Sequence, residues 1–478
     1  MSTAKNILLR PGQQVAFDKL KVFIENPKSK IFILKGFAGT GKTTMMRVLI
    51  EELQRQELRF SLLASTGRAA KIVSNIAKCE AKTVHGLIYS FQELNQDMEK
   101  LVADRKSSGV DKSGQLLLNF ELITVNTVSA EQRIYIVDEA SMVSDKADPN
   151  AIQAIFGSGK LLGDLLKYDP KGKFIFVGDE CQLPPVTQNF SPALSANYIA
   201  DQYQLPTDEV NLSDIVRQDA DNDIIQASKK VRELFHYPPD IKWAKFPLRG
   251  HKNIKLYADQ ASLISQYVKS IQQTGYNDTT FICYSNRTCD MMTTMIRPML
   301  GITGTTLQKN DLLLVTQNNY ISGLMNGDLV RVENVGIREK RAGLTFVKVE
   351  VKELFTNKLY TQLLIENIVY NNQTNLSQAE QKELFVDYFL RMRAKGIAQN
   401  SPLFNKYMMV DPYLNALRAV YGYALTCHKS QGGEWNHVYL DIAKNVPAIE
   451  KPYVYQWMYT AMTRARIQLH IVDSWWVS

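Results

Sequence analysis

The chain contains 478 residues, of which 45% are hydrophobic and 22% charged, and its formal net charge is +8. At about 150 residues per domain, this length predicts about three domains. The composition excludes a wholly disordered chain, a collagen and a coiled-coil rod. The positive charge is compatible with a polyanionic partner, but a charge of this size does not identify one.

The cysteines and the apolar runs indicate the compartment. The five cysteines are scattered along the chain, and no two have the C-x-x-C spacing of a zinc or redox site. The N-terminal residues lack the apolar core of a signal peptide, and nowhere do about 18 apolar residues follow one another. We therefore expect a soluble cytoplasmic protein with reduced cysteines and no membrane span.

Short apolar runs, typical of buried strands, alternate with helical stretches through the first half. The runs cover residues 30–34, 60–64, 134–137 and 174–177. Continuous apolar strands separated by helices are what a parallel sheet covered on both faces requires, so the pattern predicts an α/β fold. The alternation stops between residues 90 and 130. There a helical stretch at 98–106 and a polar loop precede residues 116–128, which are expected to form paired strands.

The pattern changes again in the second half. A buried strand is expected at 281–284, but after Gly327 the chain becomes β-rich with no crossover helix, which predicts a small antiparallel barrel or sheet. The β-rich runs are residues 328–334, 344–352 and 360–365. A helix follows, whose apolar residues are better explained as a packing face than as a partner site. They are Leu384, Phe385, Tyr388, Phe389 and Met392. Residues 438–440 and 469–472 read as buried strands.

Residues 36–43 read G-F-A-G-T-G-K-T and match the phosphate-binding pattern G-x-x-x-x-G-K-[ST]. An apolar strand ends at Leu34, and a helical run starts near Thr44. The glycines allow backbone N–H groups to turn toward phosphate oxygens, and the helix N-terminus adds partial positive charge. Lys42 is expected to reach the β- and γ-phosphates, and Thr43 to place its hydroxyl on Mg²⁺. The sequence therefore predicts a nucleoside triphosphate site.

Two later strands end in polar residues that suit the same site. Asp138 and Glu139 follow the strand at 134–137. Asp138 would hold Mg²⁺ through its water shell, and Glu139 would polarise the attacking water. Gln182 follows the strand at 174–177 and would hydrogen-bond the γ-phosphate or that water, a contact that hydrolysis removes.

The order of these motifs resembles that of the superfamily 1 helicases, specifically their RecD/Dda-like branch. Besides GFAGTGKT and IVDEASM, the segment GDECQLPPV resembles the third motif of this branch. Later motifs are matched by LSDIVRQ, CYSNRTCD, Asn326-Gly327-Asp328, TCHKSQGGEW and YTAMTRAR. The resemblance covers nearly the whole chain. It implies two RecA-like P-loop domains with parallel sheets that bind one ATP between them, the first carrying a β-hairpin insertion and the second an SH3-like β-barrel insertion.

The domains that the resemblance implies are discontinuous in sequence. The first RecA-like domain would comprise residues 1–89 and 131–207, with a pin or wedge insertion at 90–130. The second would comprise residues 208–327 and 415–478. Residues 328–414 would form the SH3-like insertion, with a helical extension that closes over the strand as a hook.

The resemblance also assigns residues to the nucleotide. Gln13 would read the adenine edge, and Arg217 and Arg464 would approach the γ-phosphate from the second domain and stabilise the transition state. The residues expected to bind ATP are Gln13, Gly36, Ala38, Gly39, Thr40, Gly41, Lys42, Thr43, Thr44, Gly433 and Glu434. Those expected to be catalytic are Lys42, Asp138, Glu139, Gln182, Arg217 and Arg464, and the Mg²⁺ ligands are Thr43 and Asp138. Tyr459 is assigned no role beyond packing. Ser65 replaces the proline of the family's A-P-T-G-R-A-A-K motif, which removes a fixed φ angle from that loop.

Further residues lie in motifs that the family uses on single-stranded nucleic acid. Hydroxyls, amides and helix N-termini contact phosphates and sugars without reading the bases, as a motor that moves over any sequence requires. The set is Thr66, Arg68, Thr83, His85, Phe120, Ser285, Asn286, His428, Lys429 and Ser430. For His85 and His428 a packing role is equally open. Phe120 is either a residue of the pin that stacks on an unpaired base or a core aromatic.

Together these observations predict an ATP- and Mg²⁺-dependent DNA helicase that binds single-stranded DNA and junctions with duplex DNA. It would move 5′ to 3′ and act as a monomer. The direction rests on the resemblance alone. Two alternatives stay open: an RNA-directed or translocase-only motor, and a nucleic-acid-binding motor subunit of a larger complex with weak activity alone.

Overall fold

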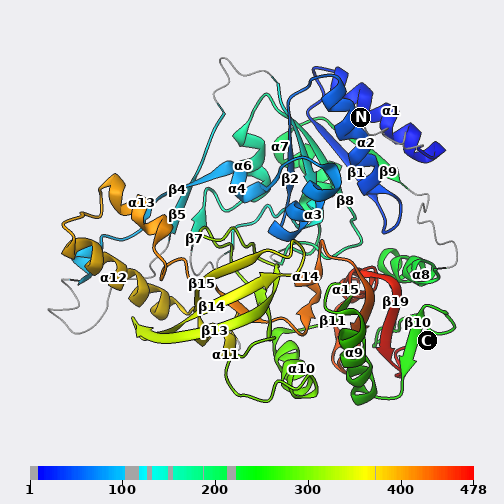
Figure 1. Ribbon diagram of the computed structural model, residues 1–478. Coiled ribbons are helices and arrows are strands. Elements are labelled where there is room, and N and C mark those ends of the chain that lie inside the picture. Colours follow the sequence, from blue (N-terminus) through cyan, green and yellow to red (C-terminus); the bar gives the residue numbers. More distant parts are fainter. Residues whose placement is uncertain are drawn as a thin grey trace, which may run out of the picture.

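The computed structural model describes residues 9–102, 118–125, 132–148, 154–186, 188–212, 222–371 and 373–478. Within these ranges the chain forms two α/β units, each carrying an inserted antiparallel region. Figure 1 shows the first unit above the second, with the inserted strands and helices α12 and α13 extending to one side. No helix in the described ranges has the length and apolar character that crossing a bilayer demands.

The first unit is built on a six-stranded parallel sheet with the order β3-β2-β6-β8-β1-β9. Its strands are β1 (Ile31–Gly36), β2 (Phe60–Ala64), β3 (Ala81–Thr83), β6 (Ile134–Asp138), β8 (Lys173–Gly178) and β9 (Thr207–Leu212). The central strands are buried along their length. This explains their continuous apolar sequences, because helices cover both faces of the sheet.

Alternate side chains of these strands pack into two hydrophobic clusters, one on each face. One face is covered by α1 (Pro11–Glu25), α2 (Lys42–Arg55) and α3 (Gly67–Ala77). The other is covered by α4 (Val84–Ile88), α6 (Leu161–Tyr168) and α7 (Ala196–Tyr203), with 3-10 turns at Ala140–Met142 and Pro192–Leu194. The predicted α/β fold with a parallel sheet is confirmed.

Helix α1 is held at both ends. At its N-terminal end, the Gln13 side chain donates a hydrogen bond to the carbonyl of Thr40, 3.2 Å away. At its C-terminal end, the buried Lys173 of β8 donates to the carbonyls of Phe23, Ile24 and Asn26. A lysine ammonium at this position satisfies carbonyls that have no partner within the helix.

The insertion in the first unit forms a small three-stranded sheet with the order β4-β5-β7. Strands β4 (Tyr89–Leu94) and β5 (Leu118–Leu122) are antiparallel, and β7 (Ala154–Phe156) runs parallel to β5. The prediction of paired strands within 116–128 was wrong for residues 118–125, which hold the single strand β5. Its partners come from the sequence before and after, and residues 103–117 and 126–131 lie outside the described part.

The second unit is built on a parallel sheet with the order β10-β19-β18-β11-β17. Its strands are β10 (Ile254–Tyr257), β11 (Thr279–Cys283), β17 (Leu425–Thr426), β18 (Trp435–Leu440) and β19 (Ala465–Val472). The helices are α8 (Ile224–His236), α9 (Gln260–Thr274), α10 (Asn286–Met299), α14 (Cys427–Ser430) and α15 (Tyr453–Met462), with a 3-10 turn at Val446–Ala448.

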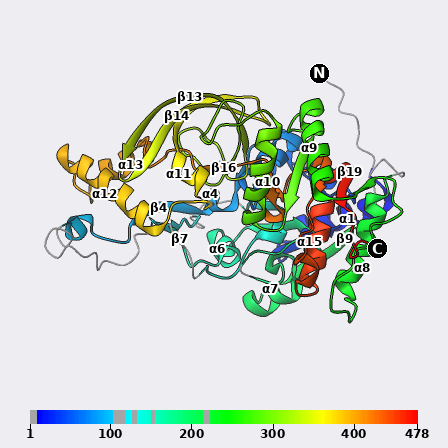
Figure 2. The same cartoon turned by 90° about the horizontal axis from the view of Figure 1, so that it is seen from below.

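A five-stranded antiparallel sheet, β15-β14-β13-β12-β16, is inserted into the second unit. It comprises β12 (Leu312–Val315), β13 (Leu329–Arg341), β14 (Leu344–Glu353), β15 (Leu359–Ile365) and β16 (Ala419–Tyr421). Helices α11 (Glu366–Tyr370), α12 (Gln378–Ala394) and α13 (Pro402–Val410) follow β15. The long β13–β14 hairpin curves toward α12 (Figure 2). The predicted packing face of α12 is buried.

The sheets extend beyond three of the expected boundaries. Strand β9 pairs with β1, so the sheet of the first unit continues past residue 207, where we expected the unit to end. Strands β12 and β16 belong to the inserted antiparallel sheet, which therefore begins before residue 328 and ends after residue 414. All three strands are short, and their sequences do not specify which sheet they join.

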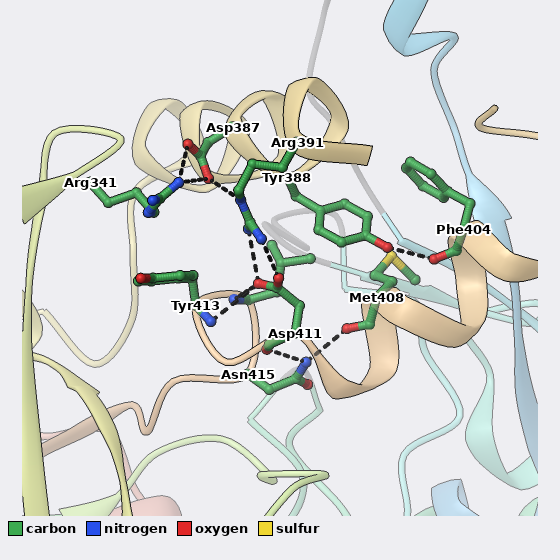
Figure 3. Close-up of polar contacts among 10 residues, drawn as sticks. Arg341, Asp387, Tyr388, Arg391, Phe404, Met408, Asp411, Tyr413 and Asn415 are labelled. Atoms are coloured by element: carbon green, nitrogen blue, oxygen red, sulfur yellow. Dashed lines mark hydrogen bonds and ion pairs between the residues drawn. The ribbon is translucent and has the colours of Figure 1, made fainter. Parts of the chain in front are cut away.

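Helices α12 and α13 form an arm that a charged network ties to the inserted sheet (Figure 3). Arg341, at the end of β13, donates to Asp387 at 3.0 Å, and Arg391 lies between Asp387 and Asp411. The arm also packs on the first unit's insertion, where Met98 and Leu94 join its apolar cluster. Gln399 hydrogen-bonds the backbone of residues 96 and 98. The two insertions are therefore in direct contact.

We expect Arg391→Met to lower the free energy of unfolding by about 3 kcal/mol, because it leaves the nearly buried Asp411 carboxylate without its cation. Denaturant titration would measure the change. Arg393→Met is the matched control, since Arg393 is exposed on the same helix and should change the stability by less than about 0.5 kcal/mol. Equal effects of the two substitutions would contradict this account.

Candidate nucleotide and strand sites

The phosphate loop lies between β1 and α2, as predicted. Gly39 and Gly41 have φ angles of +81° and +82°, a region that favours glycine over residues with a side chain. Gly41 precedes α2 and provides no side-chain cap for its N-terminus. The first N–H groups of this 14-residue helix are therefore left for an anionic ligand such as a phosphate. Thr43 and Thr44 belong to the first turn of the helix.

Lys42 and Gln13 both contact the loop itself. The Lys42 ammonium donates to the carbonyls of Gly36 and Phe37, so the side chain folds back over the loop. Gln13 is 3% exposed, and its amide oxygen accepts from the backbone N–H of Arg10 while its amide nitrogen donates to Thr40. Both residues are thus close to the place where the resemblance puts the nucleotide.

The carboxylates and Gln182 line the adjacent strand ends. Burial and the neighbouring Glu139 raise the pKa of Asp138 to about 7, against the opposing charge of Lys42. Glu139 has a left-handed backbone with φ +50°, which is uncommon for a residue other than glycine and often occurs at functional sites. The Gln182 amide oxygen is buried and accepts no hydrogen bond from the described residues. A desolvated carboxylate and a buried acceptor beside an ammonium fit a Mg²⁺–triphosphate, which would supply the missing cation and polar partners.

The second unit faces this site directly. Arg464 is buried and donates to the carbonyls of Thr460 and Gly433, at 3.0 and 3.3 Å. Arg232 of α8 lies over the ring of Phe37 in the phosphate loop, 3.5 Å from its centroid. Arg217 falls outside the described residues. Glu434 is exposed and lines a cavity of about 290 Å³ between the units.

The predicted strand-binding residues form two groups at the carboxyl ends of paired strands. In the first unit β2 pairs with β3 so that Ala64 is opposite Thr83, which brings the loop with Thr66 beside Thr83. In the second unit β11 pairs with β17 so that Cys283 is opposite Thr426, which brings Ser285 and Asn286 beside His428, Lys429 and Ser430. Lys429 donates to the Asn286 side chain at 3.3 Å.

Three residues of the two groups cap helices. Thr66, Thr83 and Ser285 accept hydrogen bonds from the backbone N–H groups of Ala69, Gly86 and Thr288. The structure therefore collects hydroxyls and helix N-termini at two neighbouring sheet edges, as contact with a sugar–phosphate backbone requires.

Three predicted strand-binding residues lie elsewhere or pack inside the protein. Arg68 stacks its guanidinium 4.6 Å from the ring centroid of Trp435 in the second unit. The His85 ring packs against Tyr89 and Phe156, and burial lowers its pKa to about 4. Phe120 stacks on Phe156, with centroids 4.7 Å apart. His85 and Phe120 thus have the packing contacts that the sequence left open.

Sequence reasoning missed contacts between the units. Lys71, the last residue of the S-T-G-R-A-A-K segment, forms an ion pair with the buried Asp328. A Cβ on Gly67 would lie 2.4 Å from the Cβ of Met325, so the start of α3 meets the second unit without room for a side chain. Lys71 and Gly67 lie in a motif that the sequence shows, but the order of motifs along the chain does not predict which residues of the other unit contact them.

Two family models match the chain: one described as "AAA domain" over residues 9–234, and one described as "UvrD-like helicase C-terminal domain" over residues 421–472. The chain is 25% identical to the ATP-dependent RecD2 DNA helicase of Deinococcus radiodurans, over 91% of this chain and 46% of that protein. In both its N-terminal and its C-terminal part the chain is thus similar to the RecD-like superfamily 1 helicases.

Other proteins match this chain over nearly its full length. It is 23% identical to protein R530 of Acanthamoeba polyphaga mimivirus, over 96% of this chain and 98% of that protein. Among solved structures, the Pif1 helicase from Bacteroides in complex with ADP-AlF3 and ssDNA has a TM-score of 0.49 at 15% identity, covering 98% of this chain and 93% of that one. The chain spans less than half of the Deinococcus relative.

The environment of His85 is expected to make the stability of the protein depend on pH. Its pKa is lowered from 6.5 to about 4 by burial, so the unfolded chain binds more protons between these values. His85 therefore contributes stability in full above pH 6.5, and this is lost as the pH falls toward 4. Because the ring is partly exposed, we expect a loss of at most about 2 kcal/mol. Denaturant midpoints from pH 7 to 4 should fall less in His85→Gln, and identical pH profiles would contradict the prediction.

Proposed function

We propose that this protein is an ATP- and Mg²⁺-dependent DNA helicase that moves 5′ to 3′ along single-stranded DNA and separates duplex DNA. The observation that carries the proposal is the contact of the phosphate loop and the Gln182 loop with α15 of the second unit. In this arrangement a change at the γ-phosphate reaches the unit that carries half of the candidate strand site. The match to a helicase C-terminal domain over these residues supports the same reading.

The nucleotide would lie on the N-terminus of α2 between the units. Lys42 would leave the loop carbonyls and hold the β- and γ-phosphates. Thr43 and Asp138 would hold Mg²⁺, which when bound neutralises charge on the phosphates. Glu139 would orient and polarise the attacking water, while Arg464 and Arg217 would stabilise charge that develops on the γ-phosphate. The charges of Lys42 and Arg464 both act on the buried Asp179, and Lys42 also acts on Asp138, which supports a common site for these roles.

The single strand would cross the two groups of predicted strand-binding residues. Thr66 and Thr83 come from the first unit, and Ser285 and His428 from the second, so closure of the cleft changes the distance between two grips on one strand. Contacts to phosphates and sugars let the motor pass over any sequence. Repeated opening and closing, driven by hydrolysis, would then give net movement along the strand.

Duplex separation would occur at the inserted regions. The rings of Phe91, Phe120 and Phe156 pack on one another and stiffen the insertion of the first unit. The arm of α12 and α13 packs on the same insertion and would close over the strand as a hook. These contacts of the described part of the insertion suit a wedge, because a wedge must resist the duplex in order to part it. The direction of movement is proposed from the family resemblance.

Lys42→Ala should abolish DNA-stimulated ATP hydrolysis, because the variant lacks the ammonium that would hold the phosphates, while binding of a single strand remains measurable. Steady-state hydrolysis with and without an oligonucleotide checks the first point, and fluorescence anisotropy checks the second. Lys28→Ala, an exposed lysine in the turn before β1, is the matched control and should hydrolyse ATP normally. Undiminished turnover in Lys42→Ala would overturn the proposal.

Duplexes with a single-stranded tail on one end test the direction. We expect strand separation with a 5′ tail and none with a 3′ tail, and the same experiment with RNA tails distinguishes an RNA-directed motor. Hydrolysis stimulated by DNA without strand separation would instead indicate a translocase. Separation of only the 3′-tailed duplex would reverse the proposed direction.

A further inference from the structure

One face of α15 makes the hydrogen bonds that join the two units at the nucleotide cleft. Gln456, Tyr459 and Thr460 are spaced so that they share this face of the helix. Thr460 accepts from the N–H of Leu183 at 2.9 Å, and Gln456 donates to the carbonyl of Glu180 at 3.2 Å. The loop of residues 179–183, which carries Gln182, is thereby held by a helix of the other unit.

Tyr459 makes the most central of these contacts. Its hydroxyl donates to Oδ2 of Asp179 at 2.7 Å and accepts from the backbone N–H of Ala38 at 3.0 Å. Tyr459 and Asp179 are each 1% exposed. A phenol has one proton to donate, so the carboxylate receives it and the N–H approaches a lone pair. One oxygen atom thus touches the phosphate loop and the Gln182 loop at once.

Packing accounts for the ring of Tyr459 but not for its hydroxyl. The ring belongs to the main hydrophobic cluster of the second unit. A phenylalanine would fill that space equally well, whereas both partners of the hydroxyl lie in the first unit. Because Tyr459 and Asp179 are buried, removing the hydroxyl leaves Oδ2 of Asp179 short of a hydrogen-bond partner, and the partly exposed N–H of Ala38 loses its contact as well. Gln456 and Thr460 also hydrogen-bond the loop of residues 179–183, so the Tyr459 hydroxyl is one of three side-chain groups of α15 that hold this loop.

We propose that Tyr459 is a positioning residue for ATP hydrolysis, whose hydroxyl sets the Gln182 loop relative to the phosphate loop when the two units are closed. This inference rests on the proposed function and adds a residue that is not itself expected to touch ATP. Gln182 is three residues from Asp179, so a shift of Asp179 moves the group that would contact the γ-phosphate or the attacking water. Small displacements of such groups are costly, because hydrolysis depends on their alignment.

Tyr459→Phe in the full chain tests the proposal. With saturating oligo(dT), we expect kcat for ATP hydrolysis to fall by about tenfold and KM for ATP to change by less than about threefold. KM should change little because Lys42 and the N-terminus of α2 remain able to bind the phosphates. Tyr455→Phe is the matched control. It removes a hydroxyl one turn earlier on α15, from a buried ring that packs on Phe246 in the second unit, and should leave kcat unchanged.

A double-variant cycle separates positioning from a general loss of stability. If Tyr459 acts through Asp179, the loss in Tyr459→Phe/Asp179→Asn should be smaller than the product of the two single losses. Unchanged or increased kcat in Tyr459→Phe, an equal loss in Tyr455→Phe, or multiplicative losses in the double variant would each overturn the inference. The proposed function would stand in all three cases. Absence of DNA-stimulated hydrolysis in the native protein would overturn the proposed function, and this inference with it.

Discussion

The two units meet through buried and partly buried hydrogen bonds, and the arrangement of the cleft depends on them. The Tyr459 hydroxyl, the Thr460 hydroxyl and the Gln456 amide all bind the loop that follows β8. Each such bond has a modest net value, but a buried group that loses its partner costs about 1–3 kcal/mol. The units are therefore expected to move between discrete arrangements in which these groups are satisfied, rather than to slide freely.

Both candidate sites follow from the geometry of parallel sheets. In such a sheet the carboxyl ends of the strands lie at one edge, where loops and helix N-termini gather. In the first unit this edge carries the phosphate loop, Asp138, Gln182 and the Thr66 loop, so the nucleotide and strand sites are neighbours on one scaffold. The second unit repeats the arrangement with Ser285 and His428. The geometry of parallel sheets thus places the candidate nucleotide site and the candidate strand site on the same two units.

The sequence was informative where structure is local. Lys42 was predicted from the phosphate-loop pattern, and Asp138 and Gln182 because each follows a continuous apolar run; both signals are visible in a few residues. The pairing of β9, β12 and β16 could not be predicted from the sequence, because strands of three to six residues join a sheet through contacts with distant segments. The same reason explains Arg68 and His85. Their motifs suggested contact with a strand, with packing equally open for His85, and the rings that they contact, Trp435 and Phe156, come from distant parts of the chain. The sequence assigned Tyr459 no role beyond packing, and only the fold reveals the partners of its hydroxyl.

Helix α1 is bound by Lys173 at its C-terminal end and by Thr40 at its N-terminal end. These two contacts fix both the length of the helix and the direction in which Gln13 points. Its 15 residues span about 22 Å, and each residue turns the helix by about 100°. A single residue inserted or deleted between the two anchors would leave the helix intact, yet would swing Gln13 away from the phosphate loop. Evolution can therefore vary the surface of this helix freely, but can change its length only by adding or removing nearly whole turns.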